Sequence, residues 1–138
     1  MAKIVPEFSR IVEITDHILN VKWKLEATFE ELQALAKRFD VIRIDNLYLD
    51  YMIISKHDIL GAYELVASIK SRVIKYIIDG KEESVDVDEN FDVVLVTNDM
   101  AKNNYDELRE YDIEIFNEDK KIDVGEIASQ YLSLCIFM

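Results

Sequence analysis

The feature that most constrains this chain is a long period-two alternation on both sides of an Asp-Gly turn. Residues 63–78 and 85–95 alternate apolar and polar side chains, and Asp79-Gly80-Lys81 lies between them. The inward positions are Leu65, Ala67, Ile69, Val73, Ile77, Val85, Val87, Phe91, Val93 and Leu95. Alternation of this kind is typical of half-buried strands, and an Asp-Gly pair favours a tight hairpin turn. The sequence therefore predicts a long antiparallel hairpin, although residues 63–78 could also be a bent pair.

Three further segments show strand patterns. Residues 21–27 place Trp23 in phase with apolar neighbours, so we expect Trp23 to lie in the core. Residues 41–54 are predicted as a strand in two pieces, broken at Asp45-Asn46. A short strand is expected within residues 112–116.

Two helix starts carry capping signals. Thr28 is followed three residues later by Glu31, the spacing of a capping box, and the apolar stripe after it runs to about Phe39. Asp123 with Glu126 predicts the N-terminus of a last helix in the same way.

Residues 98–111 are polar and are predicted to be a mobile loop. The whole pattern predicts one α+β domain spanning residues 1–138. Its architecture is expected to be a curled, mainly antiparallel and barrel-like β-sheet of about five to seven strands with two helices.

Charge is distributed unevenly along the chain. The net charge is −12, yet residues 1–78 carry 11 acidic and 11 basic side chains. Residues 79–138 carry 17 acidic and 5 basic side chains. An acidic surface repels phosphate backbones and attracts basic partners. This argues against tight nucleic-acid binding through the C-terminal part, although acidity also serves solubility alone.

Residues that could support catalysis or metal binding are sparse. His17 and His57, the latter in a predicted turn at residues 56–58, have no Cys or His partner at ligand spacing. Cys135 is the lone cysteine, and no basic neighbour in the sequence would activate it. Residues 86–97 begin like a calcium loop but lack its glycine and its final glutamate. We therefore expect no cofactor, no metal and no enzymatic activity, with an unmarked catalytic site as a remote alternative.

Nothing in the sequence predicts export or membrane insertion. No apolar run approaches the roughly 20 residues of a membrane helix, and residues 1–7 show no secretory signal. A soluble, cytoplasmic protein is the expectation.

Two candidate binding surfaces lie on the predicted hairpin. The first comprises the outward acids Asp86, Asp88 and Asp92, as a docking surface for a basic protein. The second comprises Lys70, Arg72 and Tyr76, whose shared parity would suit an RNA contact. The alternative for each set is an exposed, solvated strand face with no role in binding.

Several short motifs occur together in a characteristic order. They are Phe8-Ser9-Arg10-Ile11-Val12, Leu35-Ala36-Lys37-Arg38-Phe39-Asp40, Ile44-Asp45-Asn46-Leu47, Phe91-Asp92-Val93-Val94-Leu95, Ile122-Asp123-Val124-Gly125-Glu126 and Tyr131-Leu132-Ser133-Leu134. With these motifs the chain resembles the YceD family, the large ribosomal RNA subunit accumulation proteins of bacteria, and in particular its alphaproteobacterial branch. The resemblance implies a non-enzymatic role in the accumulation of large-subunit ribosomal RNA, without identifying contact residues.

Charge and resemblance together predict a ribosome-assembly factor. Its partner would be a basic ribosomal protein or a pre-ribosomal particle of the large subunit; the alternative is direct RNA binding through the near-neutral N-terminal half. The apolar C-terminal side chains Leu132, Leu134, Ile136 and Phe137 are expected to be buried, either within the domain or in a homodimer.

Overall fold

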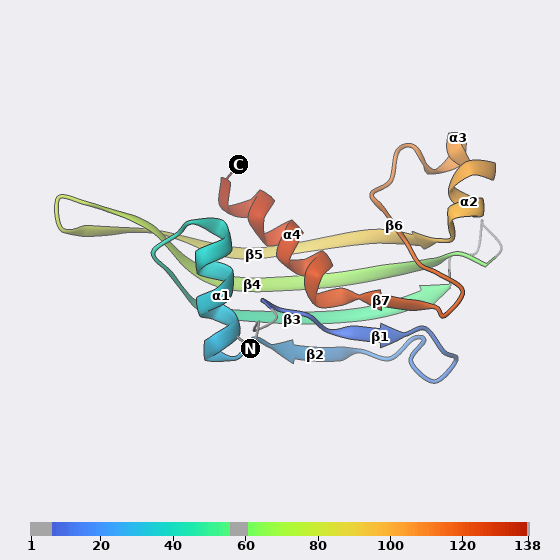
Figure 1. The fold of residues 1–138 in the computed structure, drawn as a ribbon, viewed down its shortest axis with the longest axis horizontal. Coiled ribbons are helices and arrows are strands. Elements are labelled where there is room, and N and C mark those ends of the chain that lie inside the picture. The colour runs from blue at the N-terminus through green and yellow to red at the C-terminus, as the bar shows by residue number, and fades with distance from the viewer. Residues whose placement is uncertain (1–6, 56–60, 138) are drawn as a thin grey trace, which may run out of the picture.

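The central element is a five-stranded sheet built around the predicted hairpin (Figure 1). The computed structural model describes residues 7–55 and 61–137. The strands are β1 (Ile11–Glu13), β2 (Trp23–Glu26), β3 (Arg43–Ser55), β4 (Tyr63–Ile78), β5 (Lys81–Val96), β6 (Ile113–Ile115) and β7 (Lys121–Asp123). The helices are α1 (Phe29–Phe39), α2 (Asn98–Asn103), α3 (Tyr105–Leu108) and α4 (Val124–Phe137).

The large sheet has the strand order β2-β3-β4-β5-β6, and β1 pairs with β7 in a separate ribbon. All pairs are antiparallel except β5 with β6, which run parallel. The mainly antiparallel α+β prediction is confirmed. The barrel-like prediction is wrong, because β2 and β6 form opposite edges of an open sheet among the described residues.

The β4–β5 hairpin has the predicted turn. Asp79 and Gly80 have positive φ angles of 50° and 78°, as a tight hairpin turn of the Asp-Gly kind requires. A register shift between Ile74 and Tyr76 makes Lys75 an extra residue on β4. Because this bulge reverses the facing of the residues after it, Ile77 does not face inward as predicted. Ile77 is 52% exposed, and its neighbours Tyr76 and Ile78 are exposed to a similar degree. The hairpin tip also extends beyond α1 and α4 (Figure 1).

One face of the large sheet, here called the core face, is covered by α1, α4 and the β1–β7 ribbon (Figure 1). Its buried residues include Leu47, Leu49, Tyr51, Ile53, Leu65, Ala67, Ile69, Val73, Val87, Phe91, Val93 and Leu95. The opposite face, here called the open face, is covered at one end, where Leu108 packs on Val94 and Val96. The inward positions predicted for the hairpin strands are thus largely confirmed.

Both predicted helix starts are present. The Thr28 hydroxyl accepts a hydrogen bond from the Glu31 amide at 3.2 Å, and the Glu31 carboxylate accepts one from the Thr28 amide at 2.8 Å. The Asp123 carboxylate accepts from the Glu126 amide at 3.0 Å. Each bond satisfies an amide that a helix start leaves without a partner.

The mobile loop predicted at residues 98–111 instead contains the two short helices α2 and α3. The Thr97 hydroxyl caps α2 by accepting from the Met100 amide at 3.2 Å, and Leu108 is buried against the sheet. The described residues therefore hold four helices, whereas the sequence predicted two. Helices this short show too little periodicity to be recognised.

Trp23 lies at the sheet edge and not in the core. It pairs with Tyr51, so it stands on the core face as the alternation predicts, yet it is 39% exposed. The reason is that β2 is an edge strand with one neighbour. Strand β3, predicted in two pieces, is continuous with a register shift between Ile44 and Asn46.

The apolar C-terminal segment forms the last turns of α4. Leu132 and Ile136 are buried as predicted, whereas Leu134 and Phe137 are 59% and 56% exposed. No helix among the described residues is long and apolar enough to cross a membrane.

Candidate partner-binding surface

Strand β5 concentrates exposed acidic side chains on one element. Its acids are Glu82, Glu83, Asp86, Asp88, Glu89 and Asp92, and all six are exposed. Lys81 is the single basic residue of the strand. Strand β5 therefore holds six of the 17 acidic residues in residues 79–138.

The two predicted candidate sites turn out to be neighbours on the open face. Arg72 lies opposite Asp86 in the strand register, and its Nη1 is 3.4 Å from the Asp86 Oδ1. Lys70 lies opposite Asp88. Because each base lies directly opposite an acid, the bases of β4 partly neutralise the acids of β5.

Tyr76 is separated from Lys70 and Arg72. The bulge at Lys75 places Tyr76 opposite Glu83, which is in phase with the core-face residue Val85. The Lys75 ammonium lies 5.9 Å from the centre of the Tyr76 ring. The shared parity expected for the RNA contact is therefore absent, because the aromatic ring stands on the other face.

The six β5 acids differ in their partners. Glu82 pairs with Arg43, which lowers the pKa of the Glu82 carboxyl, and Asp86 pairs with Arg72. Within residues 7–55 and 61–137, the remaining four acids form no ion pair. These are Glu83, Asp88, Glu89 and Asp92.

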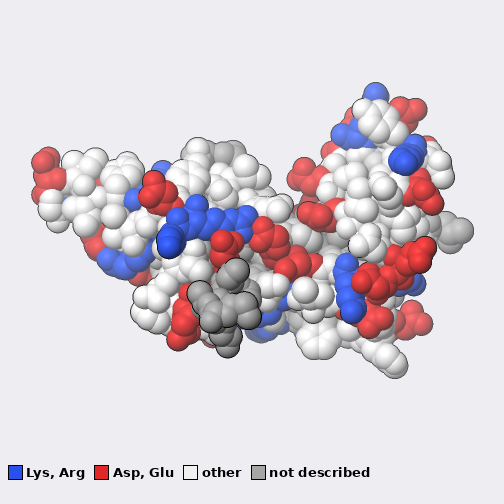
Figure 2. All heavy atoms as spheres, viewed as in Figure 1, with Lys and Arg blue, Asp and Glu red and all other residues white. Residues whose placement is uncertain are grey.

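A groove runs between β5 and α4. Its volume is about 360 Å³, and it is lined by Val85, Asp86, Val87, Glu89, Tyr131, Leu134 and Cys135. A second hollow of about 230 Å³ shares Tyr131 and Leu134 and continues past Phe91 towards β6. Figure 2 shows acidic side chains around the hollow between α4 and the α2–α3 end, where Asp112 and Glu114 contribute to its lining.

Aromatic stacking places Tyr131 in the groove, which Cys135 also lines. The Tyr131 ring stacks on Phe91 with a centroid distance of 4.3 Å and an interplanar angle of 23°. Burial, reinforced by the negative charge of Glu89, raises the pKa of the Cys135 thiol. A thiol held in its protonated form is a poor nucleophile.

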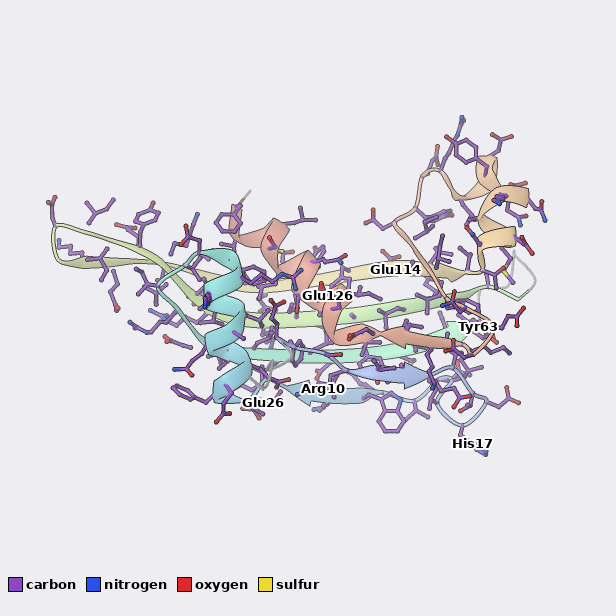
Figure 3. The ribbon with its side chains drawn as sticks, viewed as in Figure 1. Arg10, His17, Glu26, Tyr63, Glu114 and Glu126 are labelled. Carbon is purple, nitrogen blue, oxygen red and sulfur yellow. The ribbon has the colours of Figure 1, made fainter. Side chains whose placement is uncertain are left out.

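The histidines do not contribute to this surface within the described part of the chain. His17 is exposed in the turn between β1 and β2 and points away from the sheet (Figure 3). His57 and the predicted turn at residues 56–58 lie outside the described residues. No group of three His, Cys, Asp or Glu side chains in the described ranges is arranged to hold a metal ion.

Sequence reasoning missed part of this surface. Glu89 is in phase with Val87 and Phe91, so it stands on the core-face side at the mouth of the groove. The period-two alternation of β5 is enough to predict this placement of Glu89. The groove itself could not be predicted, because it depends on where α4 crosses the sheet.

Comparison of the chain with protein-family models, with curated proteins and with solved structures found no match. The resemblance to the YceD family therefore stays a prediction.

Proposed function

We propose that this chain is a non-catalytic binding protein that docks a basic protein on the acidic surface of β5. In this proposal the partner is a basic protein of the large ribosomal subunit or of its precursor particle, and the chain acts in the cytoplasm as a ribosome-assembly factor. The ribosomal part rests on the family resemblance, and the basic partner rests on the structure.

The observation that carries the proposal is the set of four exposed β5 acids without an ion pair in the described part of the chain. Like charges close together on one strand repel each other. A basic partner relieves that repulsion and gains Coulomb attraction as well. Such an interaction forms quickly and weakens as salt is added.

The same geometry disfavours RNA as the direct ligand. A phosphate approaching Lys70 or Arg72 would also meet Asp88 or Asp86 on the next strand. Tyr76, on which an RNA base was expected to stack, lies on the opposite face. A protein partner accounts for these placements better than a nucleic acid does.

The test uses a triple variant, Asp86→Asn, Asp88→Asn and Asp92→Asn, as bait in a cell lysate at low and moderate salt. The wild-type chain should capture basic large-subunit proteins that are retained after ribonuclease treatment, and the triple variant should capture several-fold less. The matched control, Glu13→Gln with Asp16→Asn and Glu118→Gln, removes three exposed charges away from β5 and should behave as the wild type.

Equal capture by the triple variant and the wild type would refute Asp86, Asp88 and Asp92 as the docking surface. Capture that disappears with ribonuclease would instead point to RNA, with Lys70 and Arg72 as the residues to replace next.

A further inference from the structure

One edge of β5 is open along most of its length. On the side away from β4, β6 pairs with β5 over Val94–Val96. In the described parts of the chain, no other backbone segment pairs with β5 on that side between Lys81 and Asp92. An unpaired strand edge presents a row of amide and carbonyl groups that can accept a further strand.

The direction of these groups follows from the bonds to β6. The Val94 amide donates to the Asp112 carbonyl at 2.8 Å, so the backbone groups of Val94 face away from β4. Residues two apart in a strand face the same way, and the β5 register is unbroken from Val94 back to Ser84. The residues that face the open edge are therefore Ser84, Asp86, Asp88, Asn90 and Asp92.

Tyr131 supports this direction independently. Its hydroxyl donates to the Asn90 carbonyl at 3.5 Å from α4, on the side away from β4. This long contact covers one carbonyl of the edge, and the stretch from Ser84 to Asp88 has no comparable cover among the described residues. The accessible part of the edge is thus the stretch beside the groove.

The groove beside this edge favours apolar side chains in an added strand. A strand added beside β5 would direct every second side chain to the core-face side, alongside Val85 and Val87. There it would meet Leu134, which is 59% exposed on α4. Burial of apolar surface at Leu134 would stabilise the added strand.

The negative charge of β5 determines which kind of strand could pair with its edge. On the open face, the alternate side chains of the added strand would lie near Asp86 and Asp88, which favours Lys or Arg. A second copy of β5 is a poor occupant, because its own carboxylates would face these carboxylates. The fitting segment is therefore extended, with alternating basic and apolar residues.

We infer that a segment of this kind from the basic partner pairs with the β5 edge between Ser84 and Asp88 as an added strand, with its apolar side chains in the groove under α4. This inference rests on the proposed function and specifies how the partner is held. It requires backbone hydrogen bonds between the partner and β5 in addition to charge attraction.

The test compares three fluorescent peptides of four Lys-Val repeats with blocked ends, by fluorescence anisotropy at low salt. One peptide is unmodified, one is N-methylated at every lysine and one at every valine. N-methylation removes backbone donors while keeping the charge. In an antiparallel pair the lysine amides would face β5, and in a parallel pair the valine amides would.

The inference predicts that one of the two methylated peptides binds at least about 10-fold more weakly than the unmodified peptide, while the other does not. The affected peptide then reports the strand direction. Equal binding by all three, or equal weakening of both methylated forms, overturns the inference but leaves charge-based docking intact. No binding by the unmodified peptide overturns it whatever the lysate capture shows.

A variant of the protein tests the same point from the other side. Ser84→Pro removes an amide that faces the open edge and makes no ladder bond to β4, and proline is tolerated at such edge positions. We expect Ser84→Pro to weaken peptide binding at least about 10-fold and Ser84→Ala to bind as the wild type. If folded Ser84→Pro bound equally well, the edge would not be the site. If Ser84→Pro failed to fold, the comparison of the unmodified and methylated peptides with the wild-type protein would decide whether the edge is the site.

Discussion

Two groups of acidic residues in this protein have different surroundings. In the first, Glu31 accepts from Arg10 at 2.7 Å, and the Asp123 carboxylate accepts from the Arg10 amide at 2.7 Å. Glu126 pairs with Arg38 at 2.8 Å. This group, here called the helix-start network, links the segment before β1 with the starts of α1 and α4; Figure 3 labels Arg10 and Glu126 within it.

In the second group, the acids of β5, two of six have an ion-pair partner among the described residues. The residue types are the same, and the difference lies in what surrounds them. A carboxylate that satisfies arginine and backbone donors stabilises the fold. A carboxylate exposed beside others of its kind is available to a partner. Substitutions in the first group should therefore change stability, and substitutions in the second should change binding.

The largest effect is expected at Gly125, where α4 begins beside the helix-start network. An added Cβ would lie 1.9 Å from the Phe8 carbonyl oxygen and 2.9 Å from the Arg10 amide nitrogen. Because these are backbone atoms, Gly125→Ala should lower the free energy of unfolding by about 3 kcal/mol or more, measured by urea denaturation.

The control for this variant is Gly80→Ala. A Cβ at Gly80 meets nothing within 4 Å, although its φ of 78° strains other residues, so the expected cost is about 1 kcal/mol. Equal stability of the two variants would show that the close approach at Gly125 is relieved at little cost.

A smaller effect is expected from Glu31→Gln, which keeps a capping side chain but removes the charge. The hydrogen bond from Arg10 lowers the pKa of the Glu31 carboxyl below its ordinary 4.5. The carboxylate should therefore contribute about 2 kcal/mol at neutral pH.

The pH dependence has a defined sign. Because the pKa is lower in the folded protein, the contribution of Glu31 is complete above the ordinary carboxyl pKa of 4.5 and is lost as the pH falls through the folded value. The difference in unfolding free energy between wild type and Glu31→Gln should shrink below that pH. A constant difference from neutral to acidic pH would contradict the assignment.

Trp23→Ala should cost about 1–2 kcal/mol, less than the roughly 3–5 kcal/mol expected of a core tryptophan. The reason is its 39% exposure at the β2 edge. Leu49→Ala, at a site that is 1% exposed, is the comparison and should cost more. Thermal or urea unfolding checks the order, and a larger loss at Trp23 would place it back in the core.

The smallest effect on stability is expected from the triple amide variant of Asp86, Asp88 and Asp92. Its free energy of unfolding should stay within about 0.5 kcal/mol of the wild type, because the exposed Asp86–Arg72 pair contributes little and repulsion falls. A loss of 2 kcal/mol or so in urea denaturation would mean that these acids stabilise the fold and belong with the helix-start network.

Local patterns in the sequence predicted the parts of the fold that depend on near neighbours. The Asp79-Gly80 turn and the Thr28–Glu31 capping box each involve a few adjacent residues, and both are present. The exposure of the acids at Asp86, Asp88 and Asp92 likewise followed from alternation. Their role in binding stays a prediction.

Features that depend on distant parts of the chain were not predictable. The alternation carries no sign of the bulge at Lys75, which turns Tyr76 away from Arg72. The alternation predicts that Trp23 faces inward wherever its strand lies in the sheet. Its exposure depends on β2 being an edge strand. The open edge of β5 depends on β6 stopping after three paired residues.

The most direct test of the central claim is the association rate of the unmodified Lys-Val peptide with the protein as a function of salt. For the wild type and the Glu13, Asp16 and Glu118 control variant, the rate should fall steeply as the Debye length shortens from about 30 Å at 0.01 M salt to about 3 Å at 1 M. For the triple amide variant, it should be several-fold lower at low salt and respond less to salt. Identical rates and salt slopes for the wild type and the triple variant would contradict the claim that β5 acids steer a basic partner.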